Sequence, residues 1–278
     1  MNEPSLDACA AFLQALPAYT TLHCDLAGPH LLRVTLARPD SANALNTRMG
    51  EELLDVWTRL SAEPLAARCV LLTAQGGRVF CAGGDLKERN GMDRAQWVRQ
   101  HELFERMFWT LIDLPQPVVA AVNGHAFGGG LEMALCCDFI YASRSARFGL
   151  PEVTLGIMPG GGGTQNLPRA LGERRARELL LTGEPFDATQ ALQWGLVNQL
   201  CEPEALQQEA LRVALRIAGN APLSTRQIKK SVRYGSQMEL RTALRFEIEA
   251  YNHLVDTADR LEGVRAFNER RTPVFHGK

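Results

Sequence analysis

The stretch AFGGGLEMALCCD, residues 126–138, places three consecutive glycines directly before a segment with helical character. That segment carries one acidic residue, Glu132, among apolar neighbours. Glycines at a helix start leave backbone N–H groups uncovered, and those groups have no partner inside the helix. Together with the helix dipole they favour a negative charge. The stretch therefore predicts either a site that stabilises an anion or a helix packed closely on a strand, and glycine alone does not separate the two.

Short apolar runs on both sides of this stretch predict an α/β core. Runs of this kind are typical of strands covered on both faces. They are CVLLTA (69–74), PVVAAVNG (117–124) and FIYAS (139–143). Helical patterns near 94–113 and 130–137 alternate with them, which favours an α/β architecture.

The pattern divides the chain into three parts. Residues 1–18 are an N-terminal extension that we expect to contain a short helix. Residues 19–202 hold the alternating strands and helices, and residues 203–278 are helical in pattern throughout. We therefore expect an α/β core followed by an all-helical C-terminal region.

Composition excludes several classes of function. The 278 residues carry 30 basic and 31 acidic side chains, so no broad field attracts nucleic acid or an anionic membrane. No uninterrupted apolar run is long enough to predict a membrane-spanning helix. The seven cysteines form no CxxC pair, which predicts reduced thiols, a cytoplasmic setting and no metal site.

Two further motifs flank the opening stretch. In RVFCAGGDLKER (78–89) the paired glycines allow either an ordinary turn or close approach of backbone to a ligand. FGLPEVTLGIMPGGGGTQNLPRALG (148–172) has a glycine run but lacks the lysine of a nucleotide-triphosphate loop. Glu152 follows Pro151 there, and apolar surroundings would raise the pKa of its carboxyl, although a surface position is the other reading. Exposed amides and two carboxyls suit a reaction through an enolate, with one carboxyl as base and the other as acid.

Three segments, FCAGGDLKE, NGHAFGGGLEMALCCD and FGLPEVTLGIMPGGGGTQ, together resemble the enoyl-CoA hydratase/isomerase (crotonase) superfamily in order and spacing. RPDSANALN resembles the first substrate-contacting loop of that family. The resemblance implies a spiral of ββα turns with a C-terminal helical region that builds homotrimers, often paired into homohexamers. It also implies an acyl-CoA substrate, with coenzyme A as part of that substrate and no separate cofactor.

The resemblance assigns roles to four residues. The backbone N–H groups of Gly84 and Gly129 match the family's oxyanion hole for the thioester oxygen. Glu132 and Glu152 match the two glutamates of the hydratases, with Glu132 as base and Glu152 as acid. Because both glutamates are present, we expect a hydro-lyase that adds water across the double bond of a 2-enoyl-CoA.

Coenzyme A contacts are implied at matching positions of two loops. These positions are Ala44, Ala82, Asp85, Leu86 and Lys87. A solvated surface position is the other reading of Lys87. Many members carry a basic residue just before Asn-Ala in the first loop, whereas Ser41 and Ala42 stand here, which leaves that contact in doubt.

The acyl group is less defined by sequence. The motifs are closest to methylglutaconyl-CoA hydratases and other short- or branched-chain enzymes. The segment 100–115 is expected to contribute an apolar lining through some of His101, Phe104, Met107, Phe108 and Trp109. No arginine is identifiable from sequence as a partner for a substrate carboxylate.

Two alternatives stay open at this stage. A Δ3-Δ2 enoyl-CoA isomerase can work with one carboxylate, so the second glutamate argues against it. RNA binding, described for some methylglutaconyl-CoA hydratases, would need a lysine-rich helix, and KERNGMDRAQWVRQHELFER mixes both charges.

Overall fold

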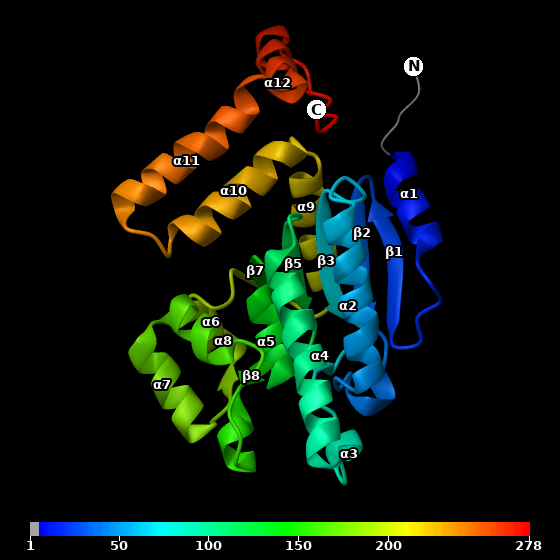
Figure 1. Ribbon diagram of the computed structural model, residues 1–278, viewed down its shortest axis with the longest axis vertical. Coiled ribbons are helices and arrows are strands. Elements are labelled where there is room, and N and C mark those ends of the chain that lie inside the picture. The colour runs from blue at the N-terminus through cyan, green and yellow to red at the C-terminus, as the bar shows by residue number, and fades with distance from the viewer. Residues whose placement is uncertain (1–5) are drawn as a thin grey trace.

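Between residues 69 and 149, successive strands alternate between two sheets, and Figure 1 labels most strands of the larger one. The computed structural model describes residues 6–278, so the first five residues of the predicted 1–18 extension lie outside it. The larger sheet has the order β1 (Leu22–Gly28), β2 (Leu31–Leu36), β3 (Cys69–Ala74), β5 (Val118–Val122), β7 (Phe139–Ser143) and β10 (Gln199–Cys201). The smaller sheet has the order β4 (Val79–Cys81), β6 (His125–Phe127), β8 (Arg147–Gly149) and β9 (Phe186–Asp187).

A repeating ββα unit generates this arrangement. The pair β3 and β4 leads into α3 (Leu86–Arg89) and α4 (Arg94–Asp113), and β5 and β6 lead into α5 (Gly129–Cys136). The pair β7 and β8 leads into the 3-10 helix η2 (Pro151–Leu155), followed by α6 (Gly163–Leu171) and α7 (Glu173–Thr182). Pairing is parallel except between β1 and β2 and between β8 and β9. The predicted spiral of ββα turns is confirmed.

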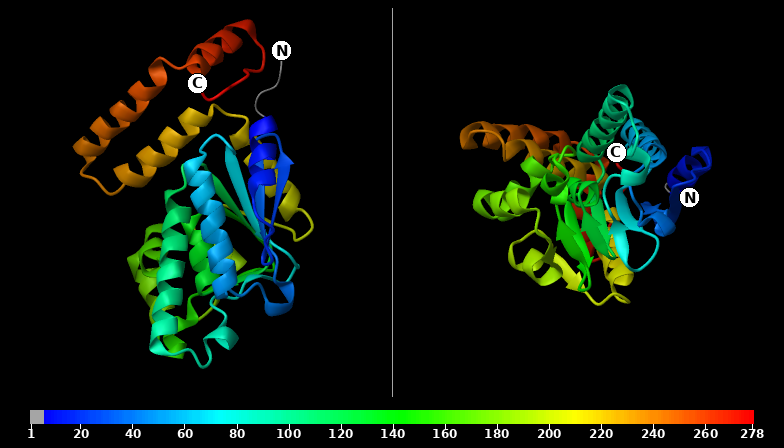
Figure 2. Two further views of the ribbon diagram at one scale, coloured as in Figure 1. Left: turned by 45° about the vertical axis from the view of Figure 1, so that its right-hand side comes forward. Right: turned by 90° about the horizontal axis from the view of Figure 1, so that it is seen from below.

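Local sequence accounts for the long helices that cover the larger sheet. Helix α2 (Thr47–Ala62) begins at Asn46, whose side chain accepts the N–H of Met49. Its apolar residues recur at helical spacing and are buried, while α4 begins with a capping box between Asp93 and Gln96. These caps satisfy amide groups that a helix start leaves open. Figure 2 shows α2 and α4 side by side against the sheet.

The core lies on both faces of the larger sheet. The main cluster fills the space between that sheet, the smaller sheet and α2, α4 and α5. On the opposite face, α9 (Leu206–Ala218) packs through its small residues Ala210, Ala214 and Ala218. Helix α8 (Ala188–Gln193) packs near β9 and β10. Strand β5 is buried along its whole length, which explains its continuous apolar sequence.

The two ends of the chain are helical. Helix α1 (Leu6–Ala15) buries Cys9 and Phe12 against the main core. At the other end, α10 (Pro222–Gly235), α11 (Leu240–Val255) and α12 (Ala258–Glu269) follow α9, and Figures 1 and 2 show α11 and α12 standing away from the sheets. Within residues 6–278, no helix is both long and apolar enough to span a membrane.

Candidate active site

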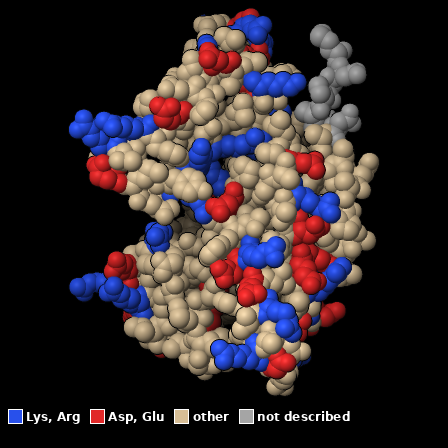
Figure 3. All heavy atoms as spheres, viewed as in Figure 1, with Lys and Arg blue, Asp and Glu red and all other residues tan. Residues whose placement is uncertain are grey.

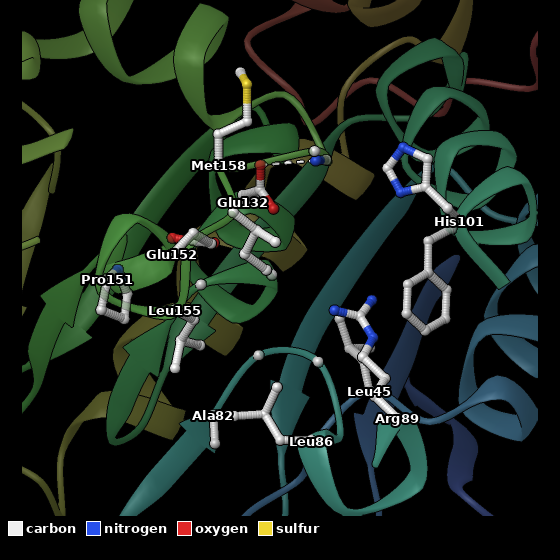
Figure 4. Close-up of a pocket in the computed structure, with 18 of the residues that line it drawn as sticks. Leu45, Ala82, Leu86, Arg89, His101, Glu132, Pro151, Glu152, Leu155 and Met158 are labelled. Carbon is white, nitrogen blue, oxygen red and sulfur yellow. Dashed lines mark hydrogen bonds between the residues drawn. The ribbon is translucent and has the colours of Figure 1, made fainter. Parts of the chain in front are cut away.

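A cavity of about 180 Å³ lies where the three sequence motifs meet. Loop 82–84, the start of α5 and η2 form one part of its wall. Residues of α3 and α4 and glycines of the loop before α6 form the rest. Figure 4 shows Glu132 and Glu152 on one side of this cavity and Arg89 and His101 on the other. Segments that are far apart in sequence therefore enclose one space.

Two glycine amides at the cavity are available to a ligand. Leu45 and Gly84 form an isolated parallel bridge. In this bridge the Leu45 N–H donates to the Gly83 oxygen, and the Asp85 N–H donates to the Leu45 oxygen. This pairing turns the Gly84 N–H away from Leu45. Gly129 is the first residue of α5, so its N–H has no acceptor within the helix. In the described part of the chain, neither N–H donates a hydrogen bond.

Tight packing brings together the two motifs that carry these amides. A Cβ built on Gly83 would lie 3.2 Å from the Gly129 nitrogen and 2.9 Å from the Phe127 oxygen. Gly83 also has a φ of +94°, which favours glycine. A side chain at this position would therefore push the first motif away from the second.

Glu132 is buried and held by the glycine loop of the third motif. Its Oε1 accepts the N–H groups of Gly161 and Gly163, both at 2.8 Å. Burial raises the pKa of Glu132 to about 7, while these two donors lower it and the neighbouring Glu152 raises it. The glycine run thus binds a carboxylate of the same chain. The start of α5 favours an ionised Glu132, but the loss of hydration on burial outweighs these backbone groups.

Glu152 is also buried, which contradicts the surface-loop reading. It lies in the first turn of η2, and its side chain approaches Gly128, where an added Cβ would lie 3.1 Å from Oε1. Its Oε2 is buried and has no hydrogen-bond partner among the described residues. Burial raises the pKa of this carboxyl. An unpartnered buried oxygen at a cavity suits a proton or a bound water.

The predicted coenzyme A residues divide into two groups. Ala82 and Leu86 line the cavity, with Leu86 half-exposed. Ala44, Asp85 and Lys87 lie outside its lining. The Asp85 carboxylate caps α3 and pairs with Arg38 at 3.1 Å, while the Asp85 N–H donates to Leu45. Arg38 also donates to the Ala44 oxygen, so a basic side chain does reach this loop. Its hydrogen bonds go to Ala44 and Asp85 of the protein itself.

The acyl side of the cavity has a polar residue that sequence reasoning missed. His101, Phe104 and Phe108 line the cavity as expected, whereas Met107 is in the core and Trp109 is exposed on the outside. Arg89 lines it as well, together with Trp97. The sequence held a signal for Trp97, because positions 97, 101, 104 and 108 share one helix face, whereas Arg89 lies on α3 and is not marked by that pattern.

A family of known proteins matches most of the chain. The sequence model of the enoyl-CoA hydratase/isomerase family matches residues 28–278. The chain belongs to the enoyl-CoA hydratase/isomerase family. It is an enzyme of the hydratase or isomerase kind that this family name describes.

Individual members of the enoyl-CoA hydratase/isomerase family match over most of their length. A crystal structure of an enoyl-CoA hydratase from Bacillus anthracis superposes with a TM-score of 0.91 at 42% identity, covering 93% of this chain and 100% of that one. The short-chain-enoyl-CoA hydratase of Clostridium acetobutylicum is 41% identical over 86% of this chain and 91% of its own. The 2,3-dehydroadipyl-CoA hydratase of Escherichia coli is 38% identical over 89% of this chain and 96% of its own.

Proposed function

We propose that this protein is a hydro-lyase that adds water across the 2,3 double bond of a short- or branched-chain 2-enoyl-CoA. The observation that carries the proposal is the pair of buried carboxyls, Glu132 and Glu152, in one cavity with two unbonded glycine amides. An isomerase needs only one carboxyl to move a proton. The names of the hydratases from Clostridium acetobutylicum and Escherichia coli support the same reaction class.

In this proposal the Gly84 and Gly129 N–H groups bind the thioester oxygen. They stabilise the negative charge that develops on this oxygen as the enolate forms. Glu132 takes a proton from water while the water oxygen attacks Cβ, and Glu152 gives its proton to Cα. The pKa of about 7 for Glu132 suits a general base near neutral pH.

The coenzyme A part of the substrate would lie along loop 82–87 and the first loop. Ala82 and Leu86 border the cavity mouth, and we retain backbone contacts at Ala44 and Asp85 and a phosphate contact at the exposed Lys87 as part of the proposal. We propose no metal and no separate cofactor. The chemistry needs only the two carboxyls and the two amides.

Two thioesters separate the hydratase from the isomerase. We expect purified protein to remove the conjugated-thioester absorbance of crotonyl-CoA through hydration. A trans-3-enoyl-CoA, which is not conjugated, would gain that absorbance with an isomerase. Gain with the 3-enoyl thioester and no loss with crotonyl-CoA would contradict the proposal and assign a Δ3-Δ2 isomerase.

RNA binding has little support on the surface. Figure 3 shows basic and acidic side chains interspersed over the face it draws. Because positive side chains do not dominate this face, it offers little electrostatic attraction to the phosphate backbone of RNA. We therefore propose that nucleic acid is not a partner, and retention of AU-rich RNA on a filter at moderate salt would contradict this.

We also propose a homotrimer or a homohexamer located in the cytoplasm. Support for self-association comes from exposed apolar side chains on α10–α12, among them Val232 (68% exposed), Leu240 (71%) and Phe267 (84%). All seven cysteines are free, which supports a reducing compartment.

A further inference from the structure

The guanidinium of Arg89 lines the cavity, and the described residues satisfy only part of its hydrogen-bonding capacity. Its Nε donates to Gln100 Oε1 at 2.8 Å. In the part of the chain that the structure describes, its two terminal nitrogens have no hydrogen-bond acceptor, and the carboxylates of Glu88 and Glu132 act on its charge without forming an ion pair. The terminal nitrogens are not among the buried unpartnered atoms of the described residues, so they are open to the cavity that Arg89 lines, where a ligand can offer an acceptor.

A built network holds this guanidinium in place. Gln100 is 4% exposed, and its Nε2 donates to Thr47 Oγ1 at 2.9 Å and to Glu88 Oε2 at 2.8 Å. The Arg89 guanidinium carbon also lies 4.7 Å from the centre of the Trp97 ring and 5.6 Å from that of Phe104. Arg89 therefore has one anchored edge and one free edge.

The free edge lies close to the predicted oxyanion hole. A Cβ built on Gly84 would lie 2.9 Å from Arg89 Nη1. Figure 4 shows the Arg89 guanidinium directed into the space between Leu86 and His101, across the cavity from Glu152. A ligand group that reaches it is thus only a few bonds from the thioester carbon. The two glutamates occupy the opposite wall, where a second anion would be repelled.

We propose that Arg89 determines specificity by binding a carboxylate on the acyl chain, so that the substrate is a short 2-enoyl-CoA ending in a carboxylate. Two parallel N–H groups of a guanidinium match the two oxygens of a carboxylate. Gln100 is a positioning residue that fixes the edge Arg89 presents. The inference rests on the proposed function, because it assigns the acyl part of the same site.

Binding of saturated thioesters tests the inference without any turnover. Adipyl-CoA and hexanoyl-CoA share a six-carbon chain and differ in their terminal carboxylate or methyl group, and glutaryl-CoA and pentanoyl-CoA form the five-carbon pair. We expect the protein to bind at least one carboxylated thioester about 10-fold more tightly than its neutral partner in calorimetry. Equal binding within both pairs, or preference for the neutral thioesters, would overturn the inference.

Variants connect the preference to this side chain. Arg89→Met keeps the length and removes the charge, and we expect it to abolish the preference for the carboxylate. Arg89→Lys should retain part of it, because a point charge replaces the planar fork. Arg99→Met is the matched control, since Arg99 is exposed on α4 beside Gln100 and lies outside the cavity lining. A preference that survives in Arg89→Met would assign the carboxylate to another group.

Failure of the proposed hydration would be recognised separately. If the protein binds the carboxylated thioesters preferentially but hydrates neither 2,3-dehydroadipyl-CoA nor trans-2-hexenoyl-CoA, the reaction is wrong and the binding role of Arg89 stands. If it hydrates both with equal kcat/KM and binds both pairs equally, the hydratase proposal stands and the Arg89 inference falls.

Discussion

At the scale of single residues, the proposed reaction depends on the Glu132 carboxylate. A substitution by glutamine removes its charge and keeps its hydrogen bonds. A glutamine at position 132 can still accept the Gly161 and Gly163 N–H groups through its Oε1. It cannot take a proton from water. We expect Glu132→Gln to lower kcat for crotonyl-CoA hydration by about 10³-fold, with an unchanged circular dichroism spectrum. A variant within a few-fold of the wild type would remove Glu132 from its proposed role.

The raised pKa of Glu132 also predicts how stability depends on pH. The unfolded chain releases this proton near the ordinary value of 4.5, and the folded protein releases it near about 7. Between these values the unfolded state binds fewer protons, so stability falls as pH rises through the window and levels off above it. The Glu132→Gln variant has no carboxyl at this position, so its stability does not fall for this reason as pH rises.

Thermal unfolding at two pH values measures the effect. We expect Glu132→Gln to melt at least about 3 °C above the wild type near pH 8, with a smaller difference near pH 5. The glutamate at the exposed position 247 offers the control, because Glu247→Gln removes one negative charge without removing a buried one. A difference between Glu132→Gln and wild type that grows toward low pH would contradict the assignment.

At the scale of elements, the site depends on how closely α5 approaches the smaller sheet. A Cβ built on Gly130 would lie 2.2 Å from the backbone oxygen of Cys81 in β4. Gly130→Ala must therefore push α5 from β4, and the Gly129 amide moves with it. We expect a loss of about 3 kcal/mol in unfolding free energy and reduced kcat in the remaining folded protein, measured by urea denaturation and by hydration assay.

Gly77→Ala is the matched substitution for this test. A Cβ at Gly77 has no atom within 4 Å, so unfolding free energy and kcat should both stay near wild type. Equal behaviour of Gly77→Ala and Gly130→Ala would mean that the approach of α5 to β4 does not set the site.

The elements were also the part most accessible from sequence. The continuous apolar runs at 69–74 and 118–122 became buried strands because helices cover both faces of the larger sheet. The helical patterns near 94–113 and 130–137 became α4 and α5. The local sequence pattern was enough to predict these strands and helices, because each pattern arises from residues that are neighbours along the chain.

The site was only partly accessible for the opposite reason. Gly84, Gly129, Glu132 and Glu152 could be selected by motif, but their neighbours come from segments distant in sequence. Nothing local indicated that the glycine loop before α6 would bind Glu132. Arg89 was missed because its anchor, Gln100, lies on the next helix and its aromatic neighbours look like core residues in sequence.

At the scale of the whole molecule, the C-terminal helices predict assembly. Leu244 and Ile248 lie one turn apart on α11 and are 52% and 55% exposed. We expect light scattering to give a mass of three or six chains of 30.7 kDa. Leu244→Asp combined with Ile248→Asp should reduce the mass to that of a single chain.

A substitution elsewhere controls for a general effect of the added charge. Val98 is 45% exposed on α4, and Val98→Asp should leave the assembly intact. A wild-type mass of one chain, or an unchanged mass in the α11 double variant, would contradict the assignment of this surface.

The central claim is that the two glutamates add water to the double bond of an enoyl thioester. The most direct measurement is the mass spectrum of the product formed from crotonyl-CoA in H₂¹⁸O. We expect the wild type to form a 3-hydroxyacyl-CoA that contains one ¹⁸O atom, and we expect Glu132→Gln and Glu152→Gln to lose this product. A product with the mass of crotonyl-CoA, or equal ¹⁸O incorporation by the glutamine variants, would contradict it.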